Sequence, residues 1–468
     1  MKRRDFFRNG ALTVIGSALI NPFSAVASII TPPNNLSKGG NAKNIIFMVS
    51  DGMSAGTLNM ADLHLNRKFG RPSNWLSIYQ ENRSVRALMD TASANSIVTD
   101  SAAASSSWGG GVRVNNGSLN VGPGGEQHKP ILQKFKAAGK AVGCVTTVPI
   151  THATPAGFCI NVGSRGDQSK IAELYLPLKF DVMMGGGAKY FDASKRKDGN
   201  DMYQKYTAAG YTLIHNRSEM MELRTDKPVL GTFADDGLPY TLDRNQDQSL
   251  QDTVPTLAEM TKKAIALMNT NNKGFVLQVE GGKVDWAAHG NDIGALLYDQ
   301  IAFDDALAEA LAFAEQDGNT LVIVTTDHGN ANPGLFSGDN ANFDRIGTFK
   351  QTNEWVLQHI NKNNTTSQVI AQIEAAQNMA ITTKEANDLL AHYNILDKNG
   401  LYNAENLPFK ILADIQQKYT NVGFGSMDHS SDYVELAMVG PGSNLLKPFI
   451  KNTDLHHLML EATGVLQN

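Results

Sequence analysis

The 468-residue sequence has little of what defines several protein classes. It contains two cysteines, so its fold does not depend on a dense disulfide framework, and a chain this long buries a large core without one. Lys and Arg number 41 against 46 Asp and Glu, a net charge of −5, which disfavours a protein with nucleic-acid specificity. We find no internal repeat with a period of about 20–50 residues.

What the sequence does contain is typical of a globular protein. Hydrophobic residues make up 42% and charged residues 19%, which is too apolar for a disordered chain. At roughly 150 residues per domain, the length predicts two or three domains, or one large α/β domain with insertions.

Residues 1–27 have the three parts of an export signal: a basic start, a short apolar stretch and the Ala25-Val26-Ala27 cleavage pattern. The pair Arg3-Arg4 before Asp5-Phe6-Phe7 resembles a twin-arginine signal. We therefore expect cleavage near Ser28 and a periplasmic or secreted protein. A general secretory signal and an inner-membrane anchor are the alternatives. No later stretch reaches the ~18 consecutive apolar residues of a transmembrane helix, so no span is expected in the mature protein.

Four strand-like apolar runs each end at or lead towards polar residues. They are residues 45–49 before Asp51, 142–145 before the segment 151–154, 275–279 before Glu280, and 321–324 before Asp327-His328. Helical patterns at 131–138, 256–268 and 294–313 alternate with them. This order predicts an α/β fold with a mostly parallel central sheet and helices on both faces. Ligands bind outside the carboxyl ends of such strands, so all four polar ends should share one edge.

The stretches outside these runs set the expected domain layout. Residues 28–43 are rich in Pro, Asn, Ser and Gly and read as an N-terminal arm, and the main domain covers 44–468. Residues 331–424 are rich in Asn, Gln and Ala, with helical runs near 368–376 and 384–392, which indicates a large insertion. The insertion could cap a site, mediate dimerisation or bind a surface. Whether Cys144 and Cys159 form a disulfide stays open at this stage.

Carboxylates and histidines recur at spacings that suit metals. Asp285 and His289 are four residues apart and face the same side of a helix, Asp327-His328 is a second pair, and His429 lies in a small, polar stretch. Imidazole with carboxylate suits zinc, while Asp51 and Glu280 also suit magnesium. A single such pair would more often be an ordinary hydrogen-bonded group. Their convergence on one edge favours a metal centre.

The octet Thr99 to Ser106 places Ser101 before a run of small residues. This pattern fits a helix N-terminus that an anion approaches closely. A capping serine without chemistry is the alternative.

Together these motifs resemble the alkaline phosphatase family across residues 44–165, 274–329 and 425–442, in the family's order. The resemblance implies a broad-specificity phosphomonoesterase that acts at alkaline pH on small phosphomonoesters through a phosphoserine. Asp100-Ser101-Ala102 matches the nucleophile signature, with Ser105 and Ser106 departing from the usual small residue and threonine, and Arg165 matches the phosphate-binding arginine. The resemblance also implies two zinc ions and one magnesium ion. One zinc would bind Asp285, His289 and His429; the second Asp51, Asp327 and His328; and the magnesium Asp51, Thr154 and Glu280.

Two neighbouring positions vary within this family. His152 stands where some members have aspartate, and Trp286 where some have lysine. Both would flank the third metal and the phosphate, so the metal preference of that site is uncertain from the sequence. A phosphodiesterase or sulfatase of the same superfamily, or a phosphate- or metal-binding protein without turnover, are the competing functions. Many members are dimers, which makes a homodimer compatible with the resemblance.

Overall fold

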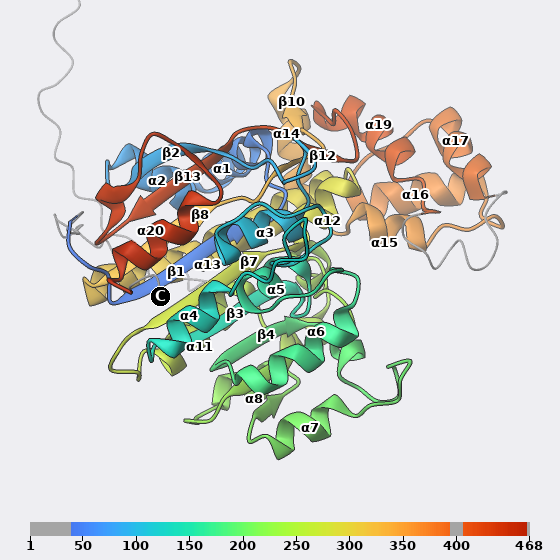
Figure 1. Ribbon diagram of the computed structural model, residues 1–468. Helices are drawn as coiled ribbons and strands as arrows, with labels where there is room; N and C mark the ends of the chain where they lie inside the picture. The colour runs from blue at the N-terminus through green and yellow to red at the C-terminus, as the bar shows by residue number, and fades with distance from the viewer. Residues whose placement is uncertain (1–38, 394–405, 466–468) are drawn as a thin grey trace, which may run out of the picture. The chain divides into compact units, whose positions relative to one another are not determined.

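The computed structural model describes residues 39–393 and 406–465 (Figure 1). The expected export signal (residues 1–27) and most of the expected arm lie outside the described residues. No helix in the described part is long and apolar enough to cross a membrane.

A ten-stranded sheet forms the centre, in the order β14-β2-β13-β8-β1-β7-β3-β4-β6-β5. All its strands run parallel except β13, which is antiparallel to both β2 and β8. The mostly parallel sheet predicted from the alternating runs is confirmed. The strands are β1 (Asn44–Ser50), β2 (Val85–Asp90), β3 (Ala141–Pro149), β4 (Val182–Gly186), β5 (Thr212–Ile214), β6 (Val229–Thr232), β7 (Phe275–Gly281), β8 (Thr320–Thr325), β13 (Val434–Val439) and β14 (Phe449–Lys451).

Both faces of this sheet are covered, as successive side chains of β1 show. Ile45 and Phe47 join one apolar cluster, whereas Ile46 and Met48 join another on the opposite face. The first cluster includes residues of α3 (Ser101–Gly110), α4 (Ile131–Ala137), α5 (Ala153–Cys159), α6 (Gln168–Tyr175), α7 (Met202–Ala208) and α20 (Asp454–Ala462). The second includes Tyr240 and residues of α1 (Ala55–Phe69), α2 (Asn74–Gln80), α8 (Arg217–Glu222), α11 (Leu257–Met268), α12 (Lys283–His289) and α13 (Ile293–Asp317). Burial on both faces explains why these strands read as continuous apolar runs.

The described residues of the segment 331–424 form mostly helices, drawn in orange to red-orange in Figure 1. Their apolar cluster includes Leu357, Ile373 and Leu412, and it continues onto Met60 of α1 and Leu297 of α13. The helices are α14 (Asn340–Arg345), α15 (Asn353–Gln358), α16 (Thr366–Gln377), α17 (Thr383–Tyr393) and α19 (Phe409–Thr420). The short strands β10 (Gly334–Leu335) and β11 (Val422–Gly423) pair where this segment leaves and rejoins the main fold.

Smaller elements complete the chain. Strand β9 (Gly329–Asn330) pairs with β12 (His429–Ser430), which brings His429 beside the end of β8. The helices α9 (Thr241–Arg244) and α10 (Gln248–Thr253) lie between β6 and α11. Cys144 and Cys159 are both buried and form no disulfide, and their sulfur atoms lie 3.8 Å apart, within hydrogen-bond distance.

Candidate metal centre and phosphate site

The sheet topology places the polar strand ends together. Strands β8, β1, β7 and β3 are neighbours, with Val49 paired to Glu280 and Thr325, and Glu280 paired to Thr146. Asp51 follows β1 by one residue and Asp327 follows β8 by two. Because the strands are parallel and in register, their carboxyl ends open on one edge. The predicted ligands therefore gather from segments more than 200 residues apart in the chain.

Three groups of side chains have donor atoms that lie within 4.8 Å of one another. The groups are Asp285 with His289 and His429, Asp51 with Asp327 and His328, and Asp51 with His152 and Glu280. The first two coincide with the ligand sets expected for the two zinc ions. In the third, His152 joins Glu280 and Asp51, and Thr154 also contacts Asp51, since its hydroxyl donates to Oδ2 at 3.3 Å.

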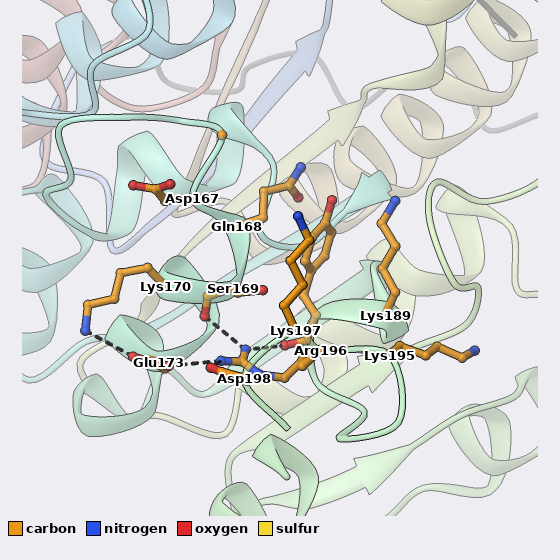
Figure 2. A pocket seen from close by; sticks show the side chains of 12 residues that line it. Asp167, Gln168, Ser169, Lys170, Glu173, Lys189, Lys195, Arg196, Lys197 and Asp198 are labelled. Carbon is orange, nitrogen blue, oxygen red and sulfur yellow. Dashed lines mark hydrogen bonds and ion pairs between the residues drawn. The ribbon is translucent and has the colours of Figure 1, made fainter. Parts of the chain in front are cut away.

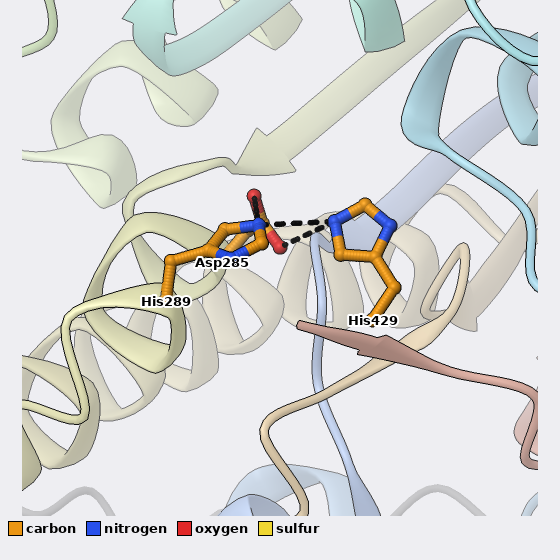
Figure 3. Close-up of side chains that lie close together, drawn as sticks. All are labelled: Asp285, His289 and His429. Atoms are coloured by element: carbon orange, nitrogen blue, oxygen red, sulfur yellow. Dashed lines mark hydrogen bonds and ion pairs between the residues drawn. The ribbon is translucent and has the colours of Figure 1, made fainter. Parts of the chain in front are cut away.

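The first group is shown in Figure 3, where Asp285 lies between the two imidazoles. Its carboxylate oxygens are 3.5 Å from His289 Nε2 and 3.6 Å from His429 Nε2. The two Nε2 atoms are 3.0 Å apart. His289 Nδ1 donates to the Met427 carbonyl at 2.7 Å, and His429 Nδ1 donates to the Thr99 carbonyl at 2.9 Å. Because both Nδ1 atoms donate to carbonyls, both Nε2 atoms face the same point, and once deprotonated they supply the lone pairs that a metal requires.

The second group is fully buried. His328 Nε2 lies 3.2 Å from Asp327 Oδ2, 3.7 Å from Asp51 Oδ1 and 3.3 Å from the Ser101 hydroxyl. The position of Ser101 follows from local structure, because Asp100 caps α3 by accepting the Ala103 N–H at 2.9 Å and leaves Ser101 as the first helical residue.

Unpartnered acceptors test whether these residues fit metal ions. Asp51 Oδ1, Asp327 Oδ2 and Glu280 Oε1 are buried without a hydrogen-bond partner among the described residues. Such atoms are rare in native proteins, and a bound cation satisfies them. Burial, followed by repulsion from the neighbouring carboxylates, raises the pKa of Asp51 well above its usual value. Burial also raises the pKa of Glu280 to about 7. The donor set fits divalent metals.

Asp285 differs from these two carboxylates. Burial opposes its ionisation, but the nearby histidines outweigh that effect and lower its pKa to about 2. Asn330 also holds this side chain, since its amide donates to Asp285 Oδ1 at 2.7 Å. Asp285 is therefore anionic over the whole physiological pH range.

The phosphate-binding candidate Arg165 lies beside the nucleophile's helix. Its Nη1 donates to Asp100 Oδ2 at 3.0 Å, and its Nη2 donates to His152 Nε2 at 3.1 Å. Because an arginine only donates, Nε2 of His152 accepts and the ring proton sits on Nδ1, which lies 4.0 Å from Glu280 Oε1. Burial and then Arg165 lower the pKa of His152 to about 3, so this ring is neutral. His152 thus links the arginine to the third group.

Trp286 lies next to His152, with the ring centroids 6.2 Å apart. Two further contacts were missed from the sequence. Thr146 donates to Glu280 Oε2 at 2.5 Å, and Asn330 holds Asp285 as described. Both are single polar residues near strand ends, and the only sequence signal for Asn330 is its place two residues after His328.

Comparison with known proteins agrees with this geometry. The alkaline phosphatase family model matches residues 42–465. Alkaline phosphatase 4 of Bacillus subtilis is 32% identical over 429 residues, 90% of this chain and 88% of that protein. Alkaline phosphatase of Escherichia coli is 34% identical over 332 residues, 62% of this chain and 70% of that protein. The crystal structure of Thermus thermophilus alkaline phosphatase superposes with a TM-score of 0.84 at 31% identity, covering 96% of this chain and 97% of that one. The chain belongs to the alkaline phosphatase family.

Proposed function

We propose that this enzyme, a metal-dependent phosphomonoesterase by family, cleaves a broad range of phosphomonoesters through a phosphoserine on Ser101. The observation that carries the proposal is the position of the Ser101 hydroxyl, which lies 3.3 Å from His328 Nε2 within the second ligand group. With zinc bound by the first two groups and magnesium by the third, the metals would supply positive charge and Lewis acidity at the phosphoryl oxygens. Because the contacts concern the phosphoryl group, the alcohol part of the substrate should be weakly selected.

The chain's own residues divide the work as follows. Arg165, oriented by Asp100, grips two phosphoryl oxygens with its planar guanidinium and stabilises the negative charge that develops there. Ser101 Oγ forms a bond to phosphorus while the ester P–O bond breaks, and the alcohol departs with a proton. Water then adds to the phosphorus, the Ser101–phosphorus bond breaks, Ser101 recovers a proton and inorganic phosphate leaves. Alkaline pH favours the deprotonated nucleophiles in both steps.

The preference of the third group for its metal depends on His152. The carboxylate oxygens of Asp51 and Glu280 in the third group suit magnesium, whereas an imidazole ligand suits zinc. In the present geometry His152 Nε2 accepts from Arg165, and Nδ1, the nitrogen nearer Glu280, carries the ring proton, so neither nitrogen offers a lone pair to a metal. We therefore assign His152 to orienting Arg165 and keep magnesium for Asp51, Thr154 and Glu280. A His152→Asp variant should bind magnesium more tightly at this group, measured by titration of the metal-free protein.

The decisive experiment is to trap the phosphoenzyme. Zinc- and magnesium-loaded protein should incorporate labelled phosphate and hydrolyse a chromogenic phosphomonoester near pH 9. Chelation should abolish turnover and the two metals together should restore it. Ser101→Ala should remove the label, whereas Ser107→Ala, on the same helix, should retain it. Equal labelling of the Ser101→Ala variant would refute the nucleophile, and faster cleavage of a diester than of a monoester would favour the phosphodiesterase alternative.

We also infer that residues 1–27 are an export signal read by the twin-arginine route, that residues 28–43 form an arm and that residues 331–424 are an insertion in the family fold. The arginine pair and the A-x-A pattern support the first point. N-terminal sequencing of the exported protein should begin near Ser28, and a first residue of Met1 would contradict the cleavage. A homodimer is tested by sedimentation of the same material.

A further inference from the structure

A cavity of about 500 Å³ begins at the residue that follows Arg165, the candidate phosphate-binding arginine. Its lining begins at Gly166, the residue after Arg165, and continues through Gln168 at the start of α6 to the segment 195–198 (Figure 2). Gln168 is joined to the catalytic edge, because Thr151, the residue before His152, donates its hydroxyl to Gln168 Oε1 at 2.8 Å. The cavity and the candidate active site therefore share one loop and one hydrogen bond.

The lining is basic although the whole chain is acidic. Five lining residues are cationic and three are anionic, which gives 5 − 3 = +2, against −5 for the chain. The cations are Lys170, Lys189, Lys195, Arg196 and Lys197, and the anions are Asp167, Glu173 and Asp198. The size matches a small-molecule site, and the excess of positive charge in the lining suits an anion.

Arg196 forms the framework of the cavity and is not a free binding group. Its side chain is 0% exposed, and it donates to Glu173 and Asp198. It also donates to the carbonyls of Ser169 and Tyr190 at 3.1 and 2.7 Å. Glu173 and Asp198 are therefore already paired with Arg196. The same contacts fix the backbone of the segment that carries Lys195 and Lys197.

Two lysines remain available to a ligand. Lys197 is exposed and has no ion-pair partner among the described residues. Lys189 pairs with Asp236 at 2.7 Å, but the two side chains are 37% and 52% exposed, and such surface pairs contribute little free energy. In Figure 2 the ends of Lys189 and Lys197 point the same way, towards the side on which Gln168 lies, while Lys195 and Asp167 point elsewhere. An incoming dianion could thus compete for both ammonium groups.

We propose that this cavity binds the second phosphate of a bisphosphorylated substrate while Arg165 and Ser101 engage the phosphate that is cleaved. The proposal rests on the phosphomonoesterase function and names a preferred substrate class for it. Arg165 and Gln168 are three residues apart, so their Cα atoms lie at most about 11 Å from each other. The backbone at the near edge of the cavity therefore lies close to Arg165.

The test compares fructose 1,6-bisphosphate with fructose 1-phosphate and fructose 6-phosphate, using phosphate release by the metal-loaded enzyme. We expect a higher kcat/KM for the bisphosphate than for either monophosphate. A Lys189→Gln/Lys197→Gln double variant should lose about 5- to 10-fold in kcat/KM for the bisphosphate and stay within twofold for the monophosphates. Lys362→Gln, which changes an exposed lysine in the segment 331–424, and Lys195→Gln, whose side chain points away, are the matched controls.

The outcomes separate this inference from the proposed function. Equal losses on all three substrates, or none on any, would overturn the subsite while leaving the phosphomonoesterase in place. If the loaded wild type hydrolyses no monophosphate, the proposed function fails. The subsite is then judged by calorimetric binding of fructose 1,6-bisphosphate to the Ser101→Ala protein. Binding that the two lysine substitutions weaken at least fivefold would support the subsite, and unchanged or undetectable binding would exclude it.

Discussion

At the residue scale, the position of Trp286 depends on the absence of one side chain. A Cβ at Gly237 would lie 2.8 Å from Trp286 Cζ3, so only glycine leaves room for the indole. The buried Lys283 covers the indole, with Nζ 4.6 Å from the Trp286 ring and 3.5 Å from the Tyr240 ring. Trp286 contacts His152, which accepts from Arg165. The orientation of the arginine therefore depends partly on a glycine in a separate loop.

Gly237→Ala should displace Trp286 towards His152 and disturb Arg165. Overpacking of this kind costs about 1–3 kcal/mol, so we expect KM for a phosphomonoester, and the inhibition constant for inorganic phosphate, to rise about tenfold. Steady-state kinetics on the metal-loaded enzyme measures both. Adding Trp286→Phe to this variant should recover much of the affinity, because the smaller ring removes the clash. Unchanged phosphate inhibition in Gly237→Ala would contradict the coupling.

The two cysteines give a second prediction at this scale. Burial raises the pKa of the Cys144 thiol, which lowers its thiolate fraction and its reactivity. Iodoacetamide at pH 8 should leave both thiols of the folded protein unmodified and alkylate both in urea. Material that reacts in urea only after reduction would instead contain a Cys144–Cys159 disulfide, and mass spectrometry distinguishes the two.

At the scale of elements, the position of the proposed nucleophile depends on the close approach of α3 and α5. A Cβ on Gly157 would lie 2.1 Å from Ser105 Oγ, and one on Gly109 would lie 2.0 Å from the Gly157 carbonyl. Ser105 also donates to the Ala153 carbonyl at 3.0 Å. This packing accounts for the small residues along α3, and it sets Ser101 on one helix relative to Thr154 on the other.

Gly157→Ala should push the two helices apart. We expect a loss of about 2 kcal/mol or more in the free energy of unfolding and at least a tenfold loss of kcat/KM, because Ser101 moves away from the ligands. Chemical denaturation and steady-state kinetics measure the two effects. Gly163→Ala is the control, since a Cβ there meets nothing within 4 Å. Equal behaviour of the two variants would show that the helix contact is not limiting.

At the scale of the whole molecule, buried carboxylates join the segment 331–424 to the main fold. Asp243 accepts from the Thr352 N–H at 2.9 Å and from its hydroxyl at 2.7 Å, and Asp292 accepts from the Asn353 N–H at 2.6 Å. Within the main fold, Asp299 accepts both donors of Thr241 at 3.2 and 3.1 Å. Burial raises the pKa of Asp292 and Asp299 to about 7 and that of Asp243 to about 6.

These shifts predict how stability depends on pH. Between about pH 4 and 7 the folded state keeps protons that the unfolded chain has lost, so stability falls as the pH rises through this window and levels off above it. Asp299→Asn should remove up to about 1.4 kcal/mol per pH unit of that slope. Urea denaturation of the metal-free protein at pH 5, 6, 7 and 8 measures it. A variant with the wild-type slope would show that Asp299 is ionised throughout.

The sequence by itself determined the elements and the chemistry of the site. The apolar runs at 45–49, 142–145, 275–279 and 321–324 all became buried parallel strands, because burial on both faces leaves a local signal. The motif order also pointed to the family, which the comparisons confirm. The antiparallel direction of β13 was not indicated by the sequence, since periodicity does not encode the orientation of a strand.

Only the tertiary structure decided which side chains meet across distant segments. Three contacts join residues from different loops. His152 accepts a hydrogen bond from Arg165, Asn330 donates to Asp285, and the indole of Trp286 packs against Gly237. The basic cavity beyond Arg165 likewise combines the start of α6 with the segment 195–198. Local sequence patterns reflect burial and backbone preference within a few residues, whereas these contacts depend on strand order and helix packing. For that reason the sequence could indicate candidate ligands, but it could not indicate the contacts that orient them.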